Sequence, residues 1–315
     1  MALLIAASTR ADLFAGQARE LSPALDVRVA PALGRVADID TALVWEPPPG
    51  LLASLPSLKL IVSIGAGVDG LLADPTLPDV PLVRFVDPDL TGRMAQYVVL
   101  HVLYHHRRMS EFRELQTRAT WRYLPEPAAR DVRVGILGLG VLGAAAAAAL
   151  RPFGYSLSGF SLSRKRIPGV TSFAGSGELD AFLAGTDVLA VILPLTARTR
   201  GMLNRSLLRR LAQPAGSCRL PGPVLINAGR GGLQVDADIA AALAEGALYA
   251  ASLDVFEQEP LPPESPLWAH PRVVVTPHNA AESAPAAIVA YALEQRRRNT
   301  QGLPLANVVD RARGY

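Results

Sequence analysis

Short apolar runs alternate with polar turn segments along most of the chain, and this rhythm predicts its elements. In the first hundred residues the apolar runs have strand length and helical pieces lie between them, which indicates a parallel α/β domain. The predicted strands are Leu3–Ala7, Val27–Ala30, Ala42–Trp45, Leu60–Ile64 and Leu82–Val86. The predicted helical pieces are Leu13–Leu21 and Leu51–Leu55.

A longer helix and a second α/β run follow. Residues Arg93 to Leu115 contain neither Gly nor Pro and place apolar side chains at helical spacing, which predicts one long helix. From Asp131 onward, strands and helices alternate as in a doubly wound nucleotide-binding sheet. The predicted strands are Val132–Leu137, Ser156–Phe160, Val188–Leu193, Val224–Ile226, Tyr249–Leu253 and Val273–Thr276. The predicted helices are one ending at Leu150, then Gly177–Leu183, Arg205–Leu211, Ala237–Glu245 and Pro285–Arg298. The fold class is therefore predicted to be α/β, with two Rossmann-like domains built on parallel sheets.

Composition narrows the possible partners. The 315 residues are 50% hydrophobic with a net charge of only +3, which excludes a disordered chain and argues against a nucleic-acid partner. Cys218 is the only cysteine, so we expect a reducing, cytoplasmic environment. The uncharged stretch Val134–Leu150 approaches the length of a membrane span, but its four glycines favour a different interpretation and no membrane partner is expected.

That interpretation is a phosphate-binding turn. Gly138-Leu139-Gly140-Val141-Leu142-Gly143 fits G-x-G-x-x-G and lies between a predicted strand and an alanine-rich helix. Gly138 permits a tight turn, Gly140 lets a pyrophosphate approach the backbone, and Gly143 allows close packing of helix and strand. The amides that open the helix, at Val141 and Leu142, then face the anion. The alternative is a glycine-rich turn in an ordinary α/β core.

The end of the next strand indicates which dinucleotide is bound. NAD sites carry an acidic residue there for the ribose 2′-hydroxyl, whereas this chain continues with Ser161, Ser163, Arg164, Lys165 and Arg166. These cations suit a 2′-phosphate, so we expect NADP(H) to be preferred, with NAD(H) possible. The alternative is a solvated basic loop.

Three candidate catalytic residues each follow a predicted strand. Arg230, Glu259 and His278 are expected to converge, because ligands of open α/β sheets bind outside the carboxyl ends of the strands. A cation, a carboxylate and an imidazole suit the reduction of a 2-oxo acid. Arg230 would bind the substrate as a fork, His278 would donate a proton, and Glu259 would orient the imidazole.

These segments resemble the D-2-hydroxyacid dehydrogenase family, and the similarity runs along the whole chain. Ser63-Ile64-Gly65-Ala66-Gly67-Val68-Asp69 resembles the loop that binds the substrate carboxylate, and Leu193-Pro194-Leu195-Thr196 resembles the loop over the cofactor. The resemblance implies further cofactor contacts from Leu193, Pro194, Thr199, Ala228, Gly229 and Asp254. It implies substrate contacts from Trp45, Ala66, Gly67, Met94, Arg230 and His278.

Longer stretches resemble the glyoxylate/hydroxypyruvate reductase branch of that family. They are Trp45–Pro48, Phe173–Gly175, Glu259–Trp268 and Val309–Tyr315. The resemblance implies NADPH-dependent reduction of glyoxylate or hydroxypyruvate and a homodimer. It also implies a flavodoxin-like substrate domain, residues 1–98 with 285–315, into which a dinucleotide-binding domain, residues 99–284, is inserted. Three features depart from the branch: the loop Gln213–Pro223 is longer, Leu162 stands where Arg is frequent, and Asn279 follows His278 where an apolar residue is usual.

Several other features have simpler interpretations. His101 and His105 have metal-like i, i+4 spacing but lack an H-E-x-x-H carboxylate, so we expect helix-surface or interdomain histidines and no metal. Trp121 is expected in the core or, with Trp45, in a substrate pocket. Arg296–Arg298 is expected to be a solvated helix end.

Two other functions remain open: a non-catalytic dinucleotide sensor of the same fold, and a formate- or phosphite-type dehydrogenase. Retention of all three candidate catalytic residues argues against the sensor. The basic segment Arg164–Arg166 argues against the second, because those enzymes are expected to favour NAD.

Overall fold

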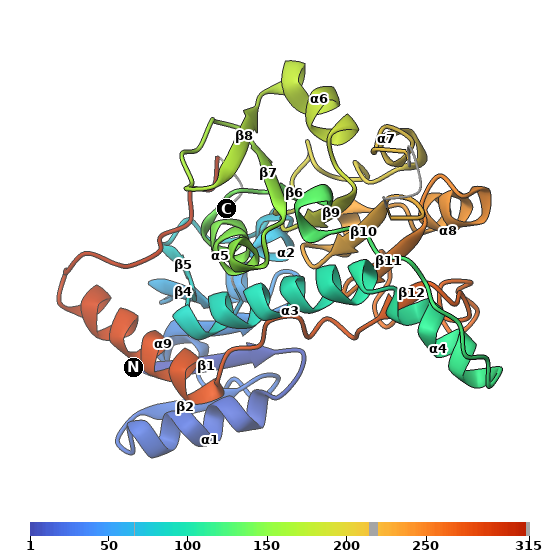
Figure 1. Ribbon diagram of the computed structural model, residues 1–315. Helices are drawn as coiled ribbons and strands as arrows, with labels where there is room; N and C mark the ends of the chain where they lie inside the picture. Colours follow the sequence, from blue (N-terminus) through green and yellow to red (C-terminus); the bar gives the residue numbers. More distant parts are fainter. Residues whose placement is uncertain (66, 214–219, 313–315) are drawn as a thin grey trace. The chain divides into compact units, whose positions relative to one another are not determined.

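The computed structural model describes residues 1–65, 67–213 and 220–312, and it forms two compact units (Figure 1). Unit 1 is Met1–Pro88 with Ser283–Tyr315, and unit 2 is Asp89–Glu282. The first junction lies at the start of helix α3, whereas the predicted limit between residues 98 and 99 lies inside that helix.

Unit 1 contains, in its described residues, a five-stranded parallel sheet with the flavodoxin-like order β2-β1-β3-β4-β5. The strands are β1 (Ala2–Ala7), β2 (Asp26–Val29), β3 (Ile39–Trp45), β4 (Leu60–Ser63) and β5 (Leu82–Arg84). The α-helices are α1 (Ala11–Leu21), α2 (Asp69–Leu72) and α9 (Pro285–Thr300), with 3-10 turns η1 (Val36–Asp38) and η2 (Leu52–Ser54).

Alternate residues of these strands supply two apolar layers, because successive strand side chains point to opposite faces. Leu3 and Ile5 pack with α1 and α9 on one face, while Leu4 packs with η2 and α2 on the other. Figure 1 shows α9 beside α1, although the two helices lie at opposite ends of the sequence. The carboxyl-terminal segment thus completes the core of the amino-terminal one.

The expectation of a solvated basic end of α9 is wrong for Arg296. Arg296 donates to both carboxylate oxygens of buried Asp40, at 3.1 and 3.0 Å. Arg297 and Arg298 both pair with Glu294 on the same helix. Buried carboxylates are paired because desolvating a lone charge is costly. Arg296 therefore stabilises the fold by pairing with the Asp40 carboxylate.

Unit 2 contains, as far as it is described, a seven-stranded parallel sheet of order β8-β7-β6-β9-β10-β11-β12. This is the dinucleotide-binding arrangement 3-2-1-4-5-6 with one more strand. The strands are β6 (Arg133–Leu137), β7 (Ser156–Ser161), β8 (Val170–Ala174), β9 (Val188–Val191), β10 (Val224–Asn227), β11 (Ala250–Leu253) and β12 (Val273–Val275). The α-helices are α3 (Pro88–His106), α4 (Met109–Thr117), α5 (Val141–Leu150), α6 (Leu179–Ala184), α7 (Arg205–Leu208) and α8 (Asp236–Glu245). The 3-10 turns are η3 (Ala129–Asp131), η4 (Arg151–Phe153), η5 (Ser176–Glu178) and η6 (Gly231–Leu233).

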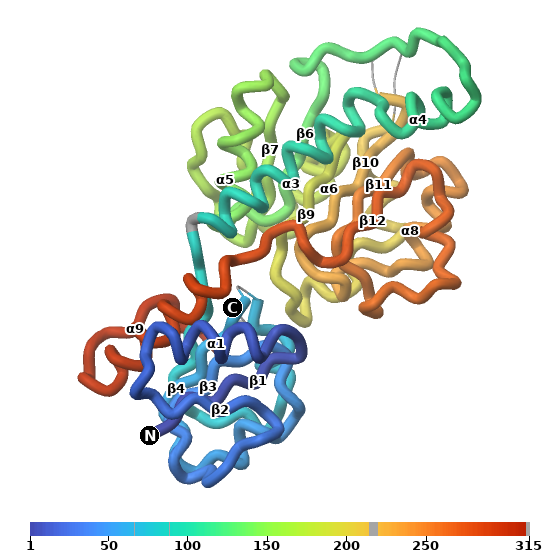
Figure 2. The backbone as a smooth tube through the Cα atoms, turned by 90° about the horizontal axis from the view of Figure 1, so that it is seen from below, coloured from blue at the N-terminus to red at the C-terminus, as the bar shows by residue number. Residues whose placement is uncertain are grey.

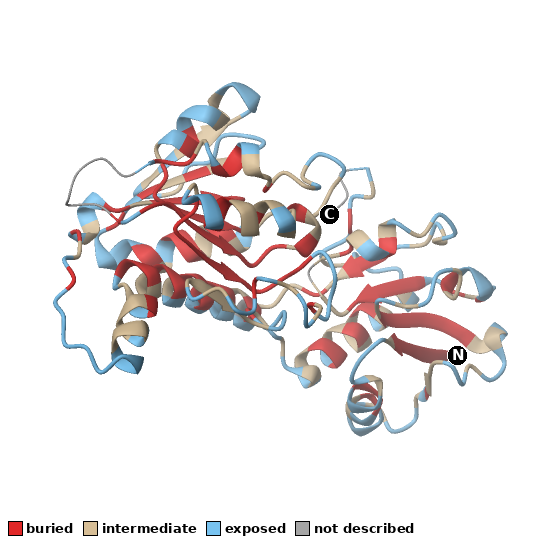
Figure 3. Ribbon diagram, turned by 90° about the vertical axis from the view of Figure 1, so that its right-hand side faces the viewer, coloured by how far each residue is buried: buried red, intermediate tan, exposed pale blue. Residues whose placement is uncertain are grey.

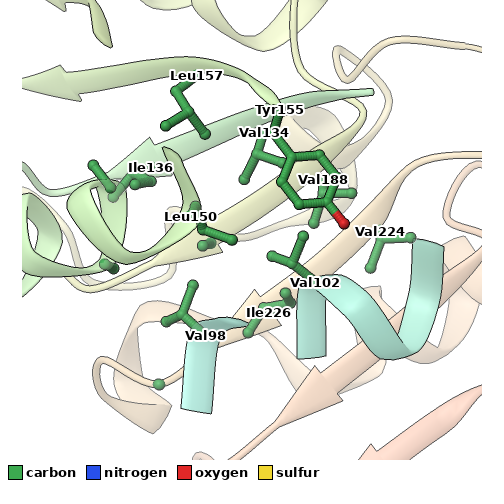
Figure 4. Packing of buried hydrophobic residues seen from close by; sticks show 14 of the residues in the cluster. Val98, Val102, Val134, Ile136, Leu150, Tyr155, Leu157, Val188, Val224 and Ile226 are labelled. Carbon is green, nitrogen blue, oxygen red and sulfur yellow. The ribbon is translucent and has the colours of Figure 1, made fainter. Parts of the chain in front are cut away.

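The unit 2 sheet is buried on both faces. Val98 and Val102 of α3 and Leu150 of α5 pack against Val134 and Ile136 of β6 on one face (Figure 4). Helices α6, α7 and α8 cover the opposite face. Figure 3 shows the strands as the buried centre beneath more exposed helices. Parallel sheets with both faces covered read as continuous apolar runs, which is why the sequence reveals these strands clearly.

One predicted element is wrong, and one strand was not predicted. The single helix over Arg93–Leu115 is divided into α3 and α4 by Arg108, whose φ of 54° is left-handed (Figure 2). The Arg108 guanidinium pairs with Glu111 one turn on and donates to the Pro125 carbonyl oxygen, so a local ion pair and one distant contact hold the break. Edge strand β8 was not predicted, because its five residues include only two large apolar side chains.

Among the described residues, no helix combines the length and the apolar character needed to cross a bilayer. The uncharged stretch Val134–Leu150 forms most of β6, the glycine turn and α5 instead.

Candidate active site

The carboxyl ends of β6, β9 and β10 bring three turns into contact in unit 2. A Cβ atom on Gly138 would lie 2.6 Å from the carbonyl oxygen of Ile192, and one on Gly229 would lie 2.8 Å from that of Leu193. Gly138 also has a φ of 115°, which L side chains rarely adopt. These two positions therefore require glycine, and the turns pack backbone against backbone. The chain leaves β6 and β9 toward opposite faces of the sheet at this point, which is where ligands usually bind in this fold.

The G-x-G-x-x-G segment forms the geometry expected of a phosphate cradle. A Cβ on Gly143 would lie 1.9 Å from the Gly138 carbonyl oxygen, whereas one on Gly140 would meet nothing within 4 Å. Gly140 precedes the first residue of α5, so the amides of Val141 and Leu142 belong to the helix start. An open glycine followed by free amides at a helix start is the arrangement that binds pyrophosphate groups.

The predicted loop over the cofactor is stabilised from within. Thr199 accepts a hydrogen bond from the Thr196 amide and donates one to the Pro194 carbonyl oxygen, each at 2.8 Å. Leu193 contacts both Gly138 and Gly229, while the buried Ala228 packs in the core beneath. The structure thus places Gly138, Leu193 and Gly229 next to one another, although they lie far apart in the sequence.

The basic residues after β7 lie on an exposed loop. Arg164 forms an ion pair with Glu178 and donates to the Ser172 carbonyl oxygen. Ser161 donates to the Ser163 carbonyl oxygen at 2.8 Å, which shapes the turn. Within the described part of the chain, the side chains of Lys165 and Arg166 have no hydrogen-bond or ion-pair partner. This loop follows the strand next to β6, as a 2′-phosphate site requires.

His278 and Glu259 form the central pair of the site. Nδ1 of His278 lies 2.8 Å from Oε2 of Glu259, and the other Glu259 oxygen accepts the Phe256 amide at 3.0 Å. The two side chains are 34% and 35% exposed, so solvent and a small ligand can reach them. Because Nδ1 is held by Glu259, Nε2 is the nitrogen free for proton transfer.

Their mutual contact shifts both pKa values. The hydrogen bond that the imidazole donates to Glu259 raises the pKa of His278, outweighing burial and the nearby Arg230 cation. Burial by itself would raise the pKa of Glu259, but hydrogen bonds from His278 and the Phe256 amide lower it overall. The pair therefore favours a protonated imidazole beside an ionised carboxylate.

Arg230 lies on a loop fixed by buried amide side chains. Asn227 donates to the Arg230 carbonyl oxygen and to Oε1 of Gln234, and it accepts the Gly229 amide. Gln234 in turn donates to Asp236 and to the Val255 carbonyl oxygen. Both amides are at most 1% exposed, so they hold the Arg230 loop against the segment that leads to Glu259. The support of the Arg230 loop by Asn227 and Gln234 was not predicted from the sequence. The only sequence signal was a polar residue, Asn227, at the end of a strand.

Asp254 is buried beneath His278. It accepts the Thr276 hydroxyl and the Asn279 amide on Oδ1, at 2.6 and 3.0 Å, and the Ala280 amide on Oδ2 at 2.9 Å. The His278 amide donates to the Asp254 carbonyl oxygen at 2.7 Å. The carboxylate thus holds the turn that carries His278.

In unit 1, the predicted substrate residue Trp45 ends β3 and packs on the loop that follows β4. A Cβ on Gly65 would lie 2.2 Å from the Trp45 ring, so the indole packs directly on the loop backbone. Gly67 follows in that loop, partly buried, whereas Ala66 lies outside the described residues. Met94 is in unit 2, 6% exposed, in the same core cluster as Ala228 and Ala280.

Two other expectations differ from the structure, and a third falls outside the described residues. His101 and His105 are buried rather than on the helix surface, and burial lowers their pKa values to about 4 and about 3. His105 bonds Ser252 at 2.8 Å, and the described residues hold no cluster of three or more ligands suited to a metal ion. Trp121 is fully exposed and is not part of a core. Cys218 and most of the loop around it lie outside the described residues.

Known proteins match this arrangement. Residues 99–280 match the family model for the D-isomer specific 2-hydroxyacid dehydrogenase NAD binding domain. The chain is 44% identical over 282 residues to glyoxylate/hydroxypyruvate reductase A of Klebsiella pneumoniae strain 342, covering 88% of each chain. It superimposes on an NADPH-dependent glyoxylate/hydroxypyruvate reductase of Sinorhizobium meliloti, solved with NADP and sulfate, with a TM-score of 0.92, 43% identity and 99% coverage of both chains. A D-isomer specific 2-hydroxyacid dehydrogenase of Xanthobacter autotrophicus, solved with NADPH and MES, gives a TM-score of 0.91 and 40% identity, covering 100% of this chain and 99% of that one. The chain belongs to the D-isomer specific 2-hydroxyacid dehydrogenase family.

Proposed function

We propose that this protein reduces small 2-oxo acids, glyoxylate to glycolate and hydroxypyruvate to D-glycerate, with NADPH. The observation that carries the proposal is the His278–Glu259 pair beside Arg230 at the carboxyl edge of a dinucleotide-type sheet. The relatives named above include reductases of glyoxylate and hydroxypyruvate.

The cofactor would be held by the glycine turn and the loops around it. Gly138, Gly140 and Gly143 with the α5 amides would take the pyrophosphate, and Arg164 and Lys165 would take the 2′-phosphate. Leu193, Pro194, Thr199, Ala228, Gly229 and Asp254 would complete the site. The bound dinucleotide would supply the hydride. The structures of two relatives contain NADPH or NADP, which supports this preference.

The three candidate catalytic side chains divide the remaining work. The Arg230 guanidinium would bind the substrate carboxylate and carbonyl oxygen, because its planar fork matches two oxygens. His278 would donate the proton on Nε2 to the oxygen that gains charge. Glu259 would hold the imidazole by Nδ1 and stabilise its protonated form. We also propose Trp45, Gly67 and Met94 as residues that contact the substrate.

The assembly and the compartment are also proposals. Large apolar side chains are exposed on α3, at Leu100 (59%), and in the segment before β6, at Trp121 and Tyr123 (84%). Contiguous apolar patches mark protein interfaces, and we propose that these side chains lie in the contact of a homodimer. A single cysteine supports a reducing, cytoplasmic environment.

A panel of 2-oxo acids followed by NADPH absorbance tests the proposal. We expect turnover with glyoxylate and hydroxypyruvate, and a loss of about 10²- to 10⁴-fold in kcat for His278→Asn, the range that general acid catalysis contributes. Full turnover by His278→Asn at saturation would overturn the mechanism. Dinucleotide binding without turnover of any acid would instead favour the sensor.

A further inference from the structure

A chain of hydroxyl groups connects helix α3 to the turn that carries His278. The Tyr97 hydroxyl lies 2.9 Å from the Thr276 hydroxyl, which lies 2.6 Å from Oδ1 of Asp254. The Thr276 hydroxyl has one proton, and an ionised carboxylate can only accept, so Thr276 donates to Asp254. Tyr97 must then donate to Thr276, which gives the chain a single direction.

The chain ends on a conformation that needs support. His278 has a φ of 53°, a left-handed value that costs energy for a residue with a side chain. The two residues after it, Asn279 and Ala280, donate their amides to the two oxygens of Asp254. Rotation of the Asp254 carboxylate would release these amides and the turn that aims the imidazole.

We propose that Tyr97 and Thr276 are positioning residues that lock the Asp254 carboxylate and thereby hold the His278 imidazole in its working orientation. This inference rests on the proposed function, because it assigns the two hydroxyls to the proton donor of that reaction. Tyr97 is not among the candidate site residues predicted from the sequence, and no role was predicted for the Thr276 hydroxyl.

Tyr97 is suited to this role because its side chain is buried and packed. Tyr97 is 8% exposed, its ring lies 4.2 Å from that of His101, and its neighbour Val98 is fully buried against the sheet. Burial raises the pKa of Tyr97, so its hydroxyl keeps the proton that it donates. Hydrogen-bonded chains of this kind in a dry interior fix geometry strongly, because the alternative is an unpaired polar group.

Thr276→Val tests the link nearest Asp254, since it keeps the shape and removes the hydroxyl. We expect kcat with glyoxylate and NADPH to fall at least tenfold, while the KM for NADPH changes less than threefold. Thr276→Ser restores the hydroxyl and should return kcat to within threefold of the parent. An unchanged kcat in Thr276→Val, or an equal loss in Thr276→Ser, would overturn the proposal.

Tyr97→Phe tests the link from α3, and Tyr104→Phe is its matched control on the same helix. The Tyr104 hydroxyl has no hydrogen-bond partner among the described residues. We expect a three- to tenfold loss of kcat for Tyr97→Phe and none for Tyr104→Phe. Equal kcat values for the two variants would contradict the role of Tyr97.

Amide hydrogen exchange separates this inference from the proposed function. In the intact protein, Thr276→Val should increase the exchange rates of the Asn279 and Ala280 amides at least tenfold, whether or not the parent reduces glyoxylate. Unchanged exchange would refute the lock even if the enzyme is active. If Thr276→Val exchanges faster but the parent protein reduces no 2-oxo acid, the positioning role of Thr276 would stand and only the proposed reaction would be refuted.

Discussion

At the scale of single residues, the site depends on one hydrogen bond between an imidazole and a carboxylate. The Glu259 contact raises the pKa of His278, so the proton donor stays charged to higher pH than a free histidine would. A reductase that uses this proton loses activity as pH rises through the raised pKa. The neighbouring charges, Arg230 and Asp254, act in opposite directions on that value.

Glu259→Gln should therefore move the alkaline decline of kcat/KM to lower pH, because the neutral amide no longer stabilises the imidazolium. The kcat at pH 7.5 should fall about tenfold or more. Profiles of kcat/KM against pH for both proteins measure the shift. Glu264→Gln is the control, an exposed glutamate on the same segment without a partner among the described residues. A Glu259→Gln profile that coincides with the parent would show that the pair does not set the donor pKa.

At the scale of elements, the turn between β6 and α5 separates two glycine functions. Gly143 allows the helix to approach the strand, since a Cβ there would collide with the Gly138 carbonyl. Gly140 has free space around it and an ordinary φ of −78°, so only a ligand limits its side chain. The loop after β7 adds charge to this cradle, and its Arg164 is already oriented by Glu178.

Gly143→Ala should destabilise unit 2 by about 2 kcal/mol, the cost of overpacking a tight site, and lower the Tm by about 4–8 °C. Gly140→Ala should leave the Tm unchanged but raise the Kd for NADPH. Differential scanning calorimetry and fluorescence titration measure the two effects. Equal melting temperatures for Gly143→Ala and Gly140→Ala would show that the Gly143 contact does not limit the fold.

Arg164→Ala should raise the KM for NADPH by roughly 10- to 100-fold and leave the KM for NADH within twofold, because only NADPH carries the 2′-phosphate. The range corresponds to the loss of one charge-assisted hydrogen-bonded pair. Steady-state kinetics with both cofactors measure the effect. Arg130→Ala, an exposed arginine of η3, controls for the change in net charge. If Arg164→Ala raised the KM values for NADPH and NADH by the same factor, Arg164 would not be the residue that binds the 2′-phosphate.

At the scale of the whole molecule, each unit completes its own core with distant parts of the sequence. Unit 1 recruits α9, with Arg296 bound to Asp40, and a short contact between Leu82 and Val309. Unit 2 leaves apolar side chains of α3 and the segment before β6 uncovered within one chain. The proposed homodimer would cover these side chains.

Trp121→Asp should shift the protein from dimer toward monomer, because an exposed indole at an interface would be replaced by a charge. Size-exclusion chromatography with light scattering measures the mass at several concentrations. Leu21→Asp, at the exposed end of α1, is the control for a surface charge. A parent of monomeric mass at all concentrations would contradict the homodimer.

Much of this protein can be predicted from sequence alone, where the signal is local. Both sheets, except for the edge strand β8, follow from apolar runs bounded by turns. The G-x-G-x-x-G turn follows from glycine chemistry between a strand and a helix. The candidate residues Arg230, Glu259 and His278 follow from their places after strands. Tertiary structure decided the rest, because it depends on contacts between distant residues. The Arg108 break is held by Pro125, buried His105 meets Ser252, and Arg296 finds Asp40. The chain from Tyr97 through Thr276 to Asp254 joins residues more than 150 positions apart, and only the packing of α3 on the sheet brings them within hydrogen-bonding distance.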